Sequence, residues 1–335
     1  MRTFAIALAA AAALWMTGCG DSTDSTSDLL DGIPDSESLR VKLPGGSTAQ
    51  SALTVQPKGA LTNSALGQTG EFYTFTRQMT EQVNSGVYQL LLMIDDIAHQ
   101  PATTKETDKW IWGPYTPGGL DPGSYRVTIQ KTGDKDYTWS LEEKPKDADD
   151  DAFKQAMGGT HTSGARPRRG AGTIALDFDA MAAVDATKPE RGQADVTYQS
   201  DTYPVTVTVA FRNFVGQDKK PPADSDYHYT ENQDGSGEFS FAIGSDIDNK
   251  GKDEDVKVMS RWLADGRGRS DVRITGGDLT AQSITEIVAV ECWDKAYLRT
   301  YFEDWATTTA QGKINIDPTQ GDAATCAYTD QKLPE

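Results

Sequence analysis

The sequence predicts a β-rich α+β protein in which one long N-terminal amphipathic helix packs against a curved antiparallel meander of strands. Two patterns lead to this fold class. Between residues 71 and 100 apolar residues recur in steps of three and four, as on one face of an α-helix. From residue 125 to about residue 302 apolar and polar residues alternate, as in strands with one buried face. Short turns join these strands, so we expect about twelve of them in an up-and-down sheet, a half-barrel or barrel-like structure around the helix.

The chain begins with an export signal. Arg2 supplies a short positive start, and residues 4–16 form an apolar run too short to cross a bilayer as a permanent helix. The run Met16-Thr17-Gly18-Cys19 resembles the lipobox of bacterial lipoproteins, in which the cysteine receives lipid and becomes the new N-terminus. The resemblance implies a signal peptide at residues 1–18 and a lipid anchor, including palmitate, on Cys19. The alternative is an ordinary cleaved signal with an incidental cysteine.

Charge and the residue after the lipobox bear on localisation. The chain carries 50 acidic and 32 basic side chains, a net charge of −18. Such a surface repels nucleic acid and anionic headgroups, so we expect no nucleic-acid partner and a membrane link through the lipid alone. Gly20 stands where enteric lipoproteins retained at the inner membrane have Asp. The resemblance therefore implies the outer membrane rather than the inner one.

Residues 19–60 are expected to form a disordered tether. They are rich in Ser, Thr, Asp, Gly and Pro and have few large apolar side chains, so they bury too little surface to offset the entropy of ordering. Residues 61–335 then form a single domain of helix and antiparallel sheet.

The helix is expected over residues 71–100 and ends before Pro101. Asn84-Ser85-Gly86 interrupts its pattern, and Gly costs about 1 kcal/mol relative to Ala in a helix. The apolar phase continues across this interruption, so we expect a kink, a bend or two collinear helices. The residues of the apolar face are Phe72, Phe75, Met79, Val83, Val87, Leu90, Ile94 and Ile97.

The strands follow the helix in short, regular steps. Trp110 and Trp112 share one face of the first strand and are expected to fill one end of the sheet; the alternative is stacking on a sugar or lipid. The expected strands lie at residues 110–115, 125–129, 137–141, 153–157, 174–178, 194–200, 205–213, 227–229, 239–243, 256–262, 272–274, 285–293 and 295–302. From there to Cys326 the chain is expected to be a loop. Cys292 and Cys326 are expected to form a disulfide, as is usual for a pair of cysteines outside the cytoplasm.

The sequence contains no recognisable catalytic motif. His99, His161 and His228 stand in no zinc-binding or nucleophile motif, so we expect no catalytic residues and a non-enzymatic role. Residues 245–255 are rich in hard oxygen ligands that suit Ca²⁺, with Asp246, Asp248, Asn249 and Asp253 as candidates. The alternative is a solvated hairpin tip, and no other cofactor is expected.

The predicted architecture resembles the half-barrel carriers of the lipoprotein-localisation and mycobacterial lipoprotein type, which hold lipid between helix and sheet. The body also resembles an uncharacterised group of bacterial surface lipoproteins, through Trp112-Gly113-Pro114, Gly276-Gly277-Asp278 and Glu291-Cys292-Trp293-Asp294. An apolar ligand or an envelope protein is therefore expected between helix and sheet, in a cavity lined by Val205, Val207, Phe239 and Phe241. The alternatives are a structural or assembly lipoprotein with a filled core and, last, a hydrolase of unrecognised type.

Overall fold

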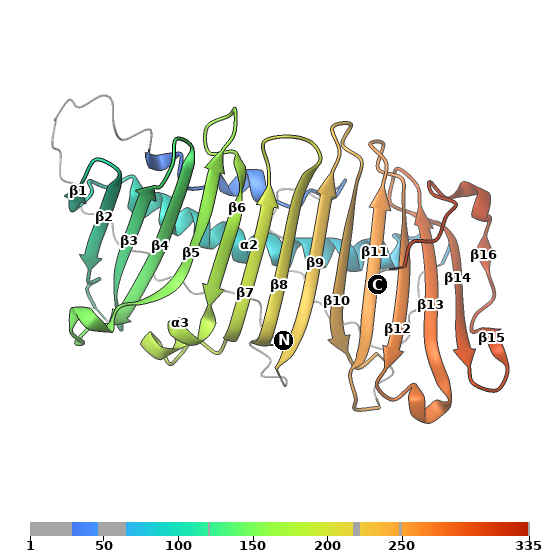
Figure 1. Ribbon diagram of the computed structural model, residues 1–335. Coiled ribbons are helices and arrows are strands. Elements are labelled where there is room, and N and C mark those ends of the chain that lie inside the picture. Colours follow the sequence, from blue (N-terminus) through green and yellow to red (C-terminus); the bar gives the residue numbers. More distant parts are fainter. Residues whose placement is uncertain (1–28, 46–64, 120, 217–221, 248–249, 334–335) are drawn as a thin grey trace.

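The computed structural model describes residues 29–45, 65–119, 121–216, 222–247 and 250–333, without the side chains of residues 82, 85–90 and 93. Sixteen strands in this part of the chain form one antiparallel sheet (Figure 1). They are β1 (Thr104–Lys105), β2 (Lys109–Tyr115), β3 (Gly123–Lys131), β4 (Asp136–Pro145), β5 (Lys154–Ser163), β6 (Gly170–Asp177), β7 (Arg191–Gln199), β8 (Val205–Val215), β9 (Ala223–Glu231), β10 (Gly237–Ser245), β11 (Glu254–Trp262), β12 (Gly268–Gly276), β13 (Ile284–Trp293), β14 (Arg299–Thr308), β15 (Gly312–Asn315) and β16 (Gln320–Gly321). Neighbours in the sheet are neighbours in the chain, except that β16 pairs with β14. The predicted β-rich antiparallel meander is thus confirmed.

The helix α2 (Glu71–Ala98) lies across one face of this sheet and crosses the strands (Figure 1). It contacts β3 near one end and β11 to β13 near the other. Its buried apolar side chains include Phe72, Met79, Leu91 and Ile94. The helix runs without a break through residues 84–86, where the sequence suggested an interruption.

The sheet does not close around the helix, so the prediction of a barrel-like structure is wrong in this respect. The outermost strands, β1 and β15, do not pair with each other. The 28 residues of α2 extend for about 42 Å. The ten steps from β3 to β13 cover about 48 Å. Because the helix is nearly as long as the sheet it crosses is wide, the sheet cannot wrap far around it.

The expected tether is wrong for residues 29–45, which are part of the folded body. This segment includes the short helix η1 (Ser36–Leu39) and runs beside α2 (Figure 1). The side-chain amide of Asn84 accepts a hydrogen bond from the backbone N–H of Val41 (2.7 Å) and donates one to its carbonyl (2.8 Å). Five apolar side chains of the segment are between 0 % and 8 % exposed and belong to the core: Leu29, Ile33, Leu39, Val41 and Leu43. Leu39, Val41 and Leu43 alternate as in a short strand, but the polar residues around them dominate the composition that predicted a tether. The rest of the expected tether, the expected signal peptide and Cys19 lie outside the described residues.

The end of the C-terminal segment, residues 326–333, lies on the outer face of the sheet, which is the face opposite α2. The predicted disulfide between Cys292 and Cys326 is present and fastens this segment to β13. Where a loop was expected after residue 302, the structure instead has the rest of β14, then β15, β16 and the short helix η4 (Ala323–Thr325). The buried carboxylate of Asp271 accepts hydrogen bonds from Arg269 (2.7 Å), from Arg261 (3.1 Å) and from the backbone N–H of Lys332 (3.1 Å).

A second buried carboxylate fixes the start of α2. Glu291 on β13 accepts hydrogen bonds from the backbone N–H groups of Glu71 (2.9 Å), Phe72 (2.8 Å) and Tyr73 (3.2 Å). First-turn N–H groups have no partner within a helix, and the helix dipole favours a negative charge there. The guanidinium of Arg299 on β14 lies 2.6 Å from the same carboxylate. Glu291 thus joins the helix to two strands at once.

We expect Glu291→Ala to lower the free energy of unfolding by about 3 to 5 kcal/mol, because it leaves Arg299 and three backbone donors buried without their acceptor. Urea unfolding, followed by circular dichroism, measures this loss. The control is Glu81→Ala on the same helix, which removes a half-buried pair with Arg77 one turn away and should cost about 0.5 kcal/mol. Equal losses in the two variants would contradict the role given to Glu291.

Candidate functional site

The four residues expected to line an apolar cavity lie in the packed core beneath α2. Val205, Val207, Phe239 and Phe241 are between 1 % and 6 % exposed and belong to one buried cluster. The ring centroids of Phe239 and Phe241 are 5.5 Å apart, and the Phe241 ring meets Phe75 of α2 edge-on at 5.2 Å. At this point the helix and the sheet are joined by aromatic side chains in direct contact.

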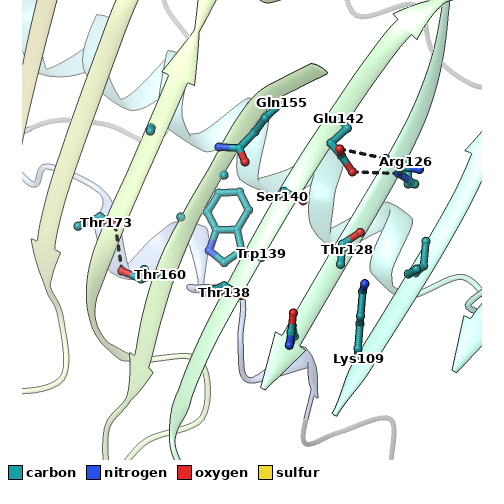
Figure 2. Close-up of a pocket in the computed structure, with 15 residues that line it drawn as sticks. Lys109, Arg126, Thr128, Thr138, Trp139, Ser140, Glu142, Gln155, Thr160 and Thr173 are labelled. Atoms are coloured by element: carbon teal, nitrogen blue, oxygen red, sulfur yellow. Dashed lines mark hydrogen bonds and ion pairs between the residues drawn. The ribbon is translucent and has the colours of Figure 1, made fainter. Parts of the chain in front are cut away.

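A hollow of about 660 Å³ lies on the outer face instead, over strands β2 to β6 (Figure 2). Its lining consists largely of hydroxyl, amide and charged side chains. The lining residues are Lys109, Ile111, Arg126, Thr128, Gln130, Thr138, Trp139, Ser140, Glu142, Gln155, Gly158, Gly159, Thr160, Thr173 and Ala175.

The hollow exists because small residues meet in register on adjacent strands. Ser140 on β4 pairs with Gly158 on β5, which pairs with Ala175 on β6. A Cβ atom on Gly158 would lie 2.7 Å from the amide nitrogen of Gln155, so a larger residue would need that side chain to move. Longer side chains stand at the rim, so the floor is lower than its surroundings.

The rim of the hollow carries charge of both signs. Arg126 and Glu142 form a bidentate pair across β3 and β4, with distances of 2.9 Å and 3.0 Å. Lys109 also lines the hollow and lies near Thr128 in Figure 2. The indole N–H of Trp139, also a lining residue, is buried and has no hydrogen-bond partner in the described part of the chain. Sites for small apolar ligands are mostly apolar and enclosed, whereas this hollow is polar and open, as suits a polar ligand.

The three histidines occupy separate places and do not converge. His99 follows the end of α2 and bonds the carbonyl of Asp95 (2.7 Å). His161 is buried beside the hydroxyl of Tyr198 (2.8 Å), and burial lowers its pKa to about 4. His228 stands on the outer face of β9, 3.2 Å from the hydroxyl of Thr208. Among the hydrogen bonds found for the described residues, none adds a carboxylate to this last pair to complete a triad.

The candidate calcium loop is only partly described. The carboxylate of Asp246 accepts hydrogen bonds from the backbone N–H groups of Lys250 (3.0 Å) and Gly251 (3.1 Å), as a turn residue does. Asp248 and Asn249 lie outside the described residues, and Asp253 has a partner of its own. No group of three or more His, Cys, Asp or Glu side chains suited to a metal ion occurs in the described ranges.

A buried acid lies at the far end of β4, on the helix-facing side. Glu143 is 2 % exposed, and its carboxylate is 3.9 Å from the ammonium of Lys188. Burial raises the pKa of Glu143 to about 7; Asp185 and Asp121 also raise this pKa, and Lys188 lowers it. Glu143 therefore changes charge near neutral pH.

Comparisons with known proteins give no relative from which a function could be taken. No family model matches the chain, and neither a curated protein nor a solved structure matches it. Within the described residues, no helix combines the length and the apolar character that crossing a bilayer requires.

The sequence analysis did not identify the outer-face residues as a site. In the predicted strand at residues 205–213, Thr206 and Thr208 alternate with valines. This alternation indicates only that the two threonines face away from the core. Arg168, in the loop between β5 and β6, has a structural role, because its guanidinium pairs with Asp95 of α2 at 2.6 Å.

We expect Glu143 to make the protein less stable as pH rises. The folded protein holds this proton up to pH of about 7, whereas an unfolded chain releases it near 4.5. The free energy of unfolding therefore falls between these pH values, by up to about 3 kcal/mol. Glu143→Gln stays neutral, so it should match the parent at pH 4 and exceed it at pH 8.

Urea unfolding at several pH values measures this difference. The control is Glu142→Gln on the same strand, which alters the half-buried pair with Arg126 of β3 but leaves Glu143 in place, so the fall in stability between pH 4.5 and 7 should remain. A Glu143→Gln variant with the same pH dependence as the parent would contradict this account of the buried acid.

Proposed function

We propose that this protein is a non-enzymatic, lipid-anchored envelope lipoprotein that binds a polar ligand or partner through the outer face of its sheet. The observation that carries this proposal is the polar, open hollow over β2 to β6. It lies on the face that neither α2 nor residues 29–45 cover. On the other face, aromatic contacts such as Phe75 with Phe241 occupy the space that an apolar ligand would need.

In this proposal the long helix is a support for the sheet. It keeps the inner face dry, and the wide sheet then presents its other face to the surroundings. The alternative is a structural or assembly lipoprotein, which the filled core also favours. The two differ in whether the outer face has a ligand.

Export and anchoring complete the proposal. Residues 1–18 direct export, and Cys19 carries the lipid, with Gly20 favouring the outer membrane. The disulfide between Cys292 and Cys326 supports an oxidising compartment. The net charge of −18 keeps the body away from anionic headgroups and nucleic acid.

We expect the full chain, expressed in a Gram-negative host with labelled palmitate, to become labelled. Cys19→Ser should abolish the label because the acceptor sulfur is lost. The double variant Cys292→Ser/Cys326→Ser is the control and should keep the label. Label in the Cys19→Ser protein, or none in the parent, would exclude the lipid anchor.

We expect native mass spectrometry of the mature chain to give a bare mass. For this measurement an ordinary cleavable export signal replaces residues 1–19. The mass should be two hydrogens lower than the reduced chain because of the disulfide. A mass excess of several hundred daltons that is lost on denaturation and extracts into organic solvent would show an apolar ligand in the core and overturn the outer-face proposal.

A further inference from the structure

Five threonines stand in one row on the outer face, one on each of five consecutive strands. The sheet register pairs Thr138 on β4 with Thr160 on β5, then Thr173, Thr197 and finally Thr208 on β8. We call this row the threonine track. At the usual spacing of about 4.8 Å between strands it is about 19 Å long. Sequence positions as far apart as 138 and 208 thus form one straight line of hydroxyl groups.

The hydroxyls of the track are accessible. All five threonines are exposed except Thr208, which is half-buried. The hydroxyls of Thr160 and Thr173 are 2.9 Å apart, and Thr208 contacts His228. A hydroxyl donates one hydrogen bond and accepts two, so these internal contacts leave capacity for a ligand.

The hollow lies at the β4 end of the track. Thr138, Thr160 and Thr173 belong to both features, and Figure 2 shows Thr160 and Thr173 side by side at the edge of the hollow. The small residues Gly158 and Ala175 border the track on this side. Track and hollow therefore form one continuous polar surface.

The same face already holds an extended chain that crosses the strands. The C-terminal segment runs from the Cys326 disulfide on β13, through the Tyr328 hydroxyl bonded to the carbonyl of Trp262 on β11, to Lys332. The ammonium of Lys332 lies 2.6 Å from Glu238 on β10. The sheet is thus flat enough for an extended polymer to lie crosswise, and the track begins two strands further on.

The side chains in and beside the track limit which polymers can bind there. The track has no large apolar side chain, which disfavours a lipid or an apolar peptide. Asp136 and Asp195 stand on the outer face in the rows beside the track, where Asp226 is paired with Arg212, and the whole chain has a net charge of −18. These charges repel polyanions. An uncharged polymer rich in hydroxyl groups fits both conditions.

We propose that the threonine track binds a linear, uncharged polysaccharide that lies across strands β4 to β8 with one end in the hollow. This inference rests on the proposed function and names its ligand class. The hydroxyls of the track donate to and accept from the sugar hydroxyls, and the amides of Gln130 and Gln155 contact the end of the chain in the hollow.

The test is co-sedimentation or affinity electrophoresis of the mature chain with cellulose, chitin and a soluble linear β-glucan. Alginate, a polyanion, and an unfolded polypeptide serve as comparison polymers. We expect binding to at least one neutral polysaccharide and none to the two comparison polymers. The triple variant Thr160→Val/Thr173→Val/Thr197→Val removes three hydroxyls, keeps branched side chains suited to strands, and should weaken binding about tenfold or more.

The matched control is Thr275→Val on the outer face of β12, outside the track, which should bind as the parent does. Equal melting temperatures of parent and variants show that all are folded. A second variant, Ser140→Gln, narrows the hollow and should also weaken binding.

Three outcomes would overturn the inference. Failure of the parent to bind any neutral polysaccharide would exclude this ligand class. The parent could instead bind alginate or the polypeptide, and Ser140→Gln could lose that binding. This result would also exclude a neutral polysaccharide as the ligand, but it would leave the proposed binding function of the outer face intact. Polysaccharide binding that neither the triple variant nor Ser140→Gln weakens would exclude both the track and the proposed function.

Discussion

The buried carboxylate of Glu291 holds together the two halves of this fold. It joins three backbone N–H groups of α2 to the guanidinium of Arg299 and so fixes where the helix begins over the sheet. At the far end, the indole N–H of Trp112 on β2 donates to the carbonyl of Gln100, just beyond α2 (2.7 Å). Between these two points the helix crosses nearly the whole sheet. A helix end buried in a core needs such partners, because water cannot reach its unpaired groups.

This arrangement divides the molecule into a dry face and a wet face. The dry face is filled by α2, by residues 29–45 and by aromatic contacts. Side chains therefore occupy the space between helix and sheet in which a carrier would hold lipid. Within the described residues, the C-terminal segment covers the wet face over β10 to β13, where it binds the Arg261, Arg269 and Asp271 cluster. The part left open is polar, and it is there that the chain can meet a ligand.

The sequence predicted those features that depend on local order. The apolar residues from Phe72 to Ile94 recur with a helical period, and the strands alternate apolar and polar residues. The disulfide between Cys292 and Cys326 was predicted from the number of cysteines. Features that depend on contacts between distant residues were missed. Ile33 and Val41 looked like parts of a tether because their hydrogen-bond partners, Arg168 and Asn84, are far away in the sequence.

The track was missed for a related reason. Alternation shows that Thr208 faces away from the core, but only the register of four successive strand pairs aligns it with Thr138. The sequence also could not predict whether the sheet closes into a barrel. Closure depends on the direction in which α2 crosses the strands, and no spacing in the sequence encodes that direction.

Because α2 crosses the strands, the width of the sheet and the length of this helix depend on each other. Because strands pair in chain order, a hairpin could be added or lost between β4 and β9 with only its immediate neighbours affected. Each hairpin widens the sheet by about 10 Å. To keep both Glu291 and Trp112 engaged, α2 would then have to change by about six or seven residues. Related chains of different size should therefore show insertions in helix and sheet together, with two turns of helix accompanying each pair of strands.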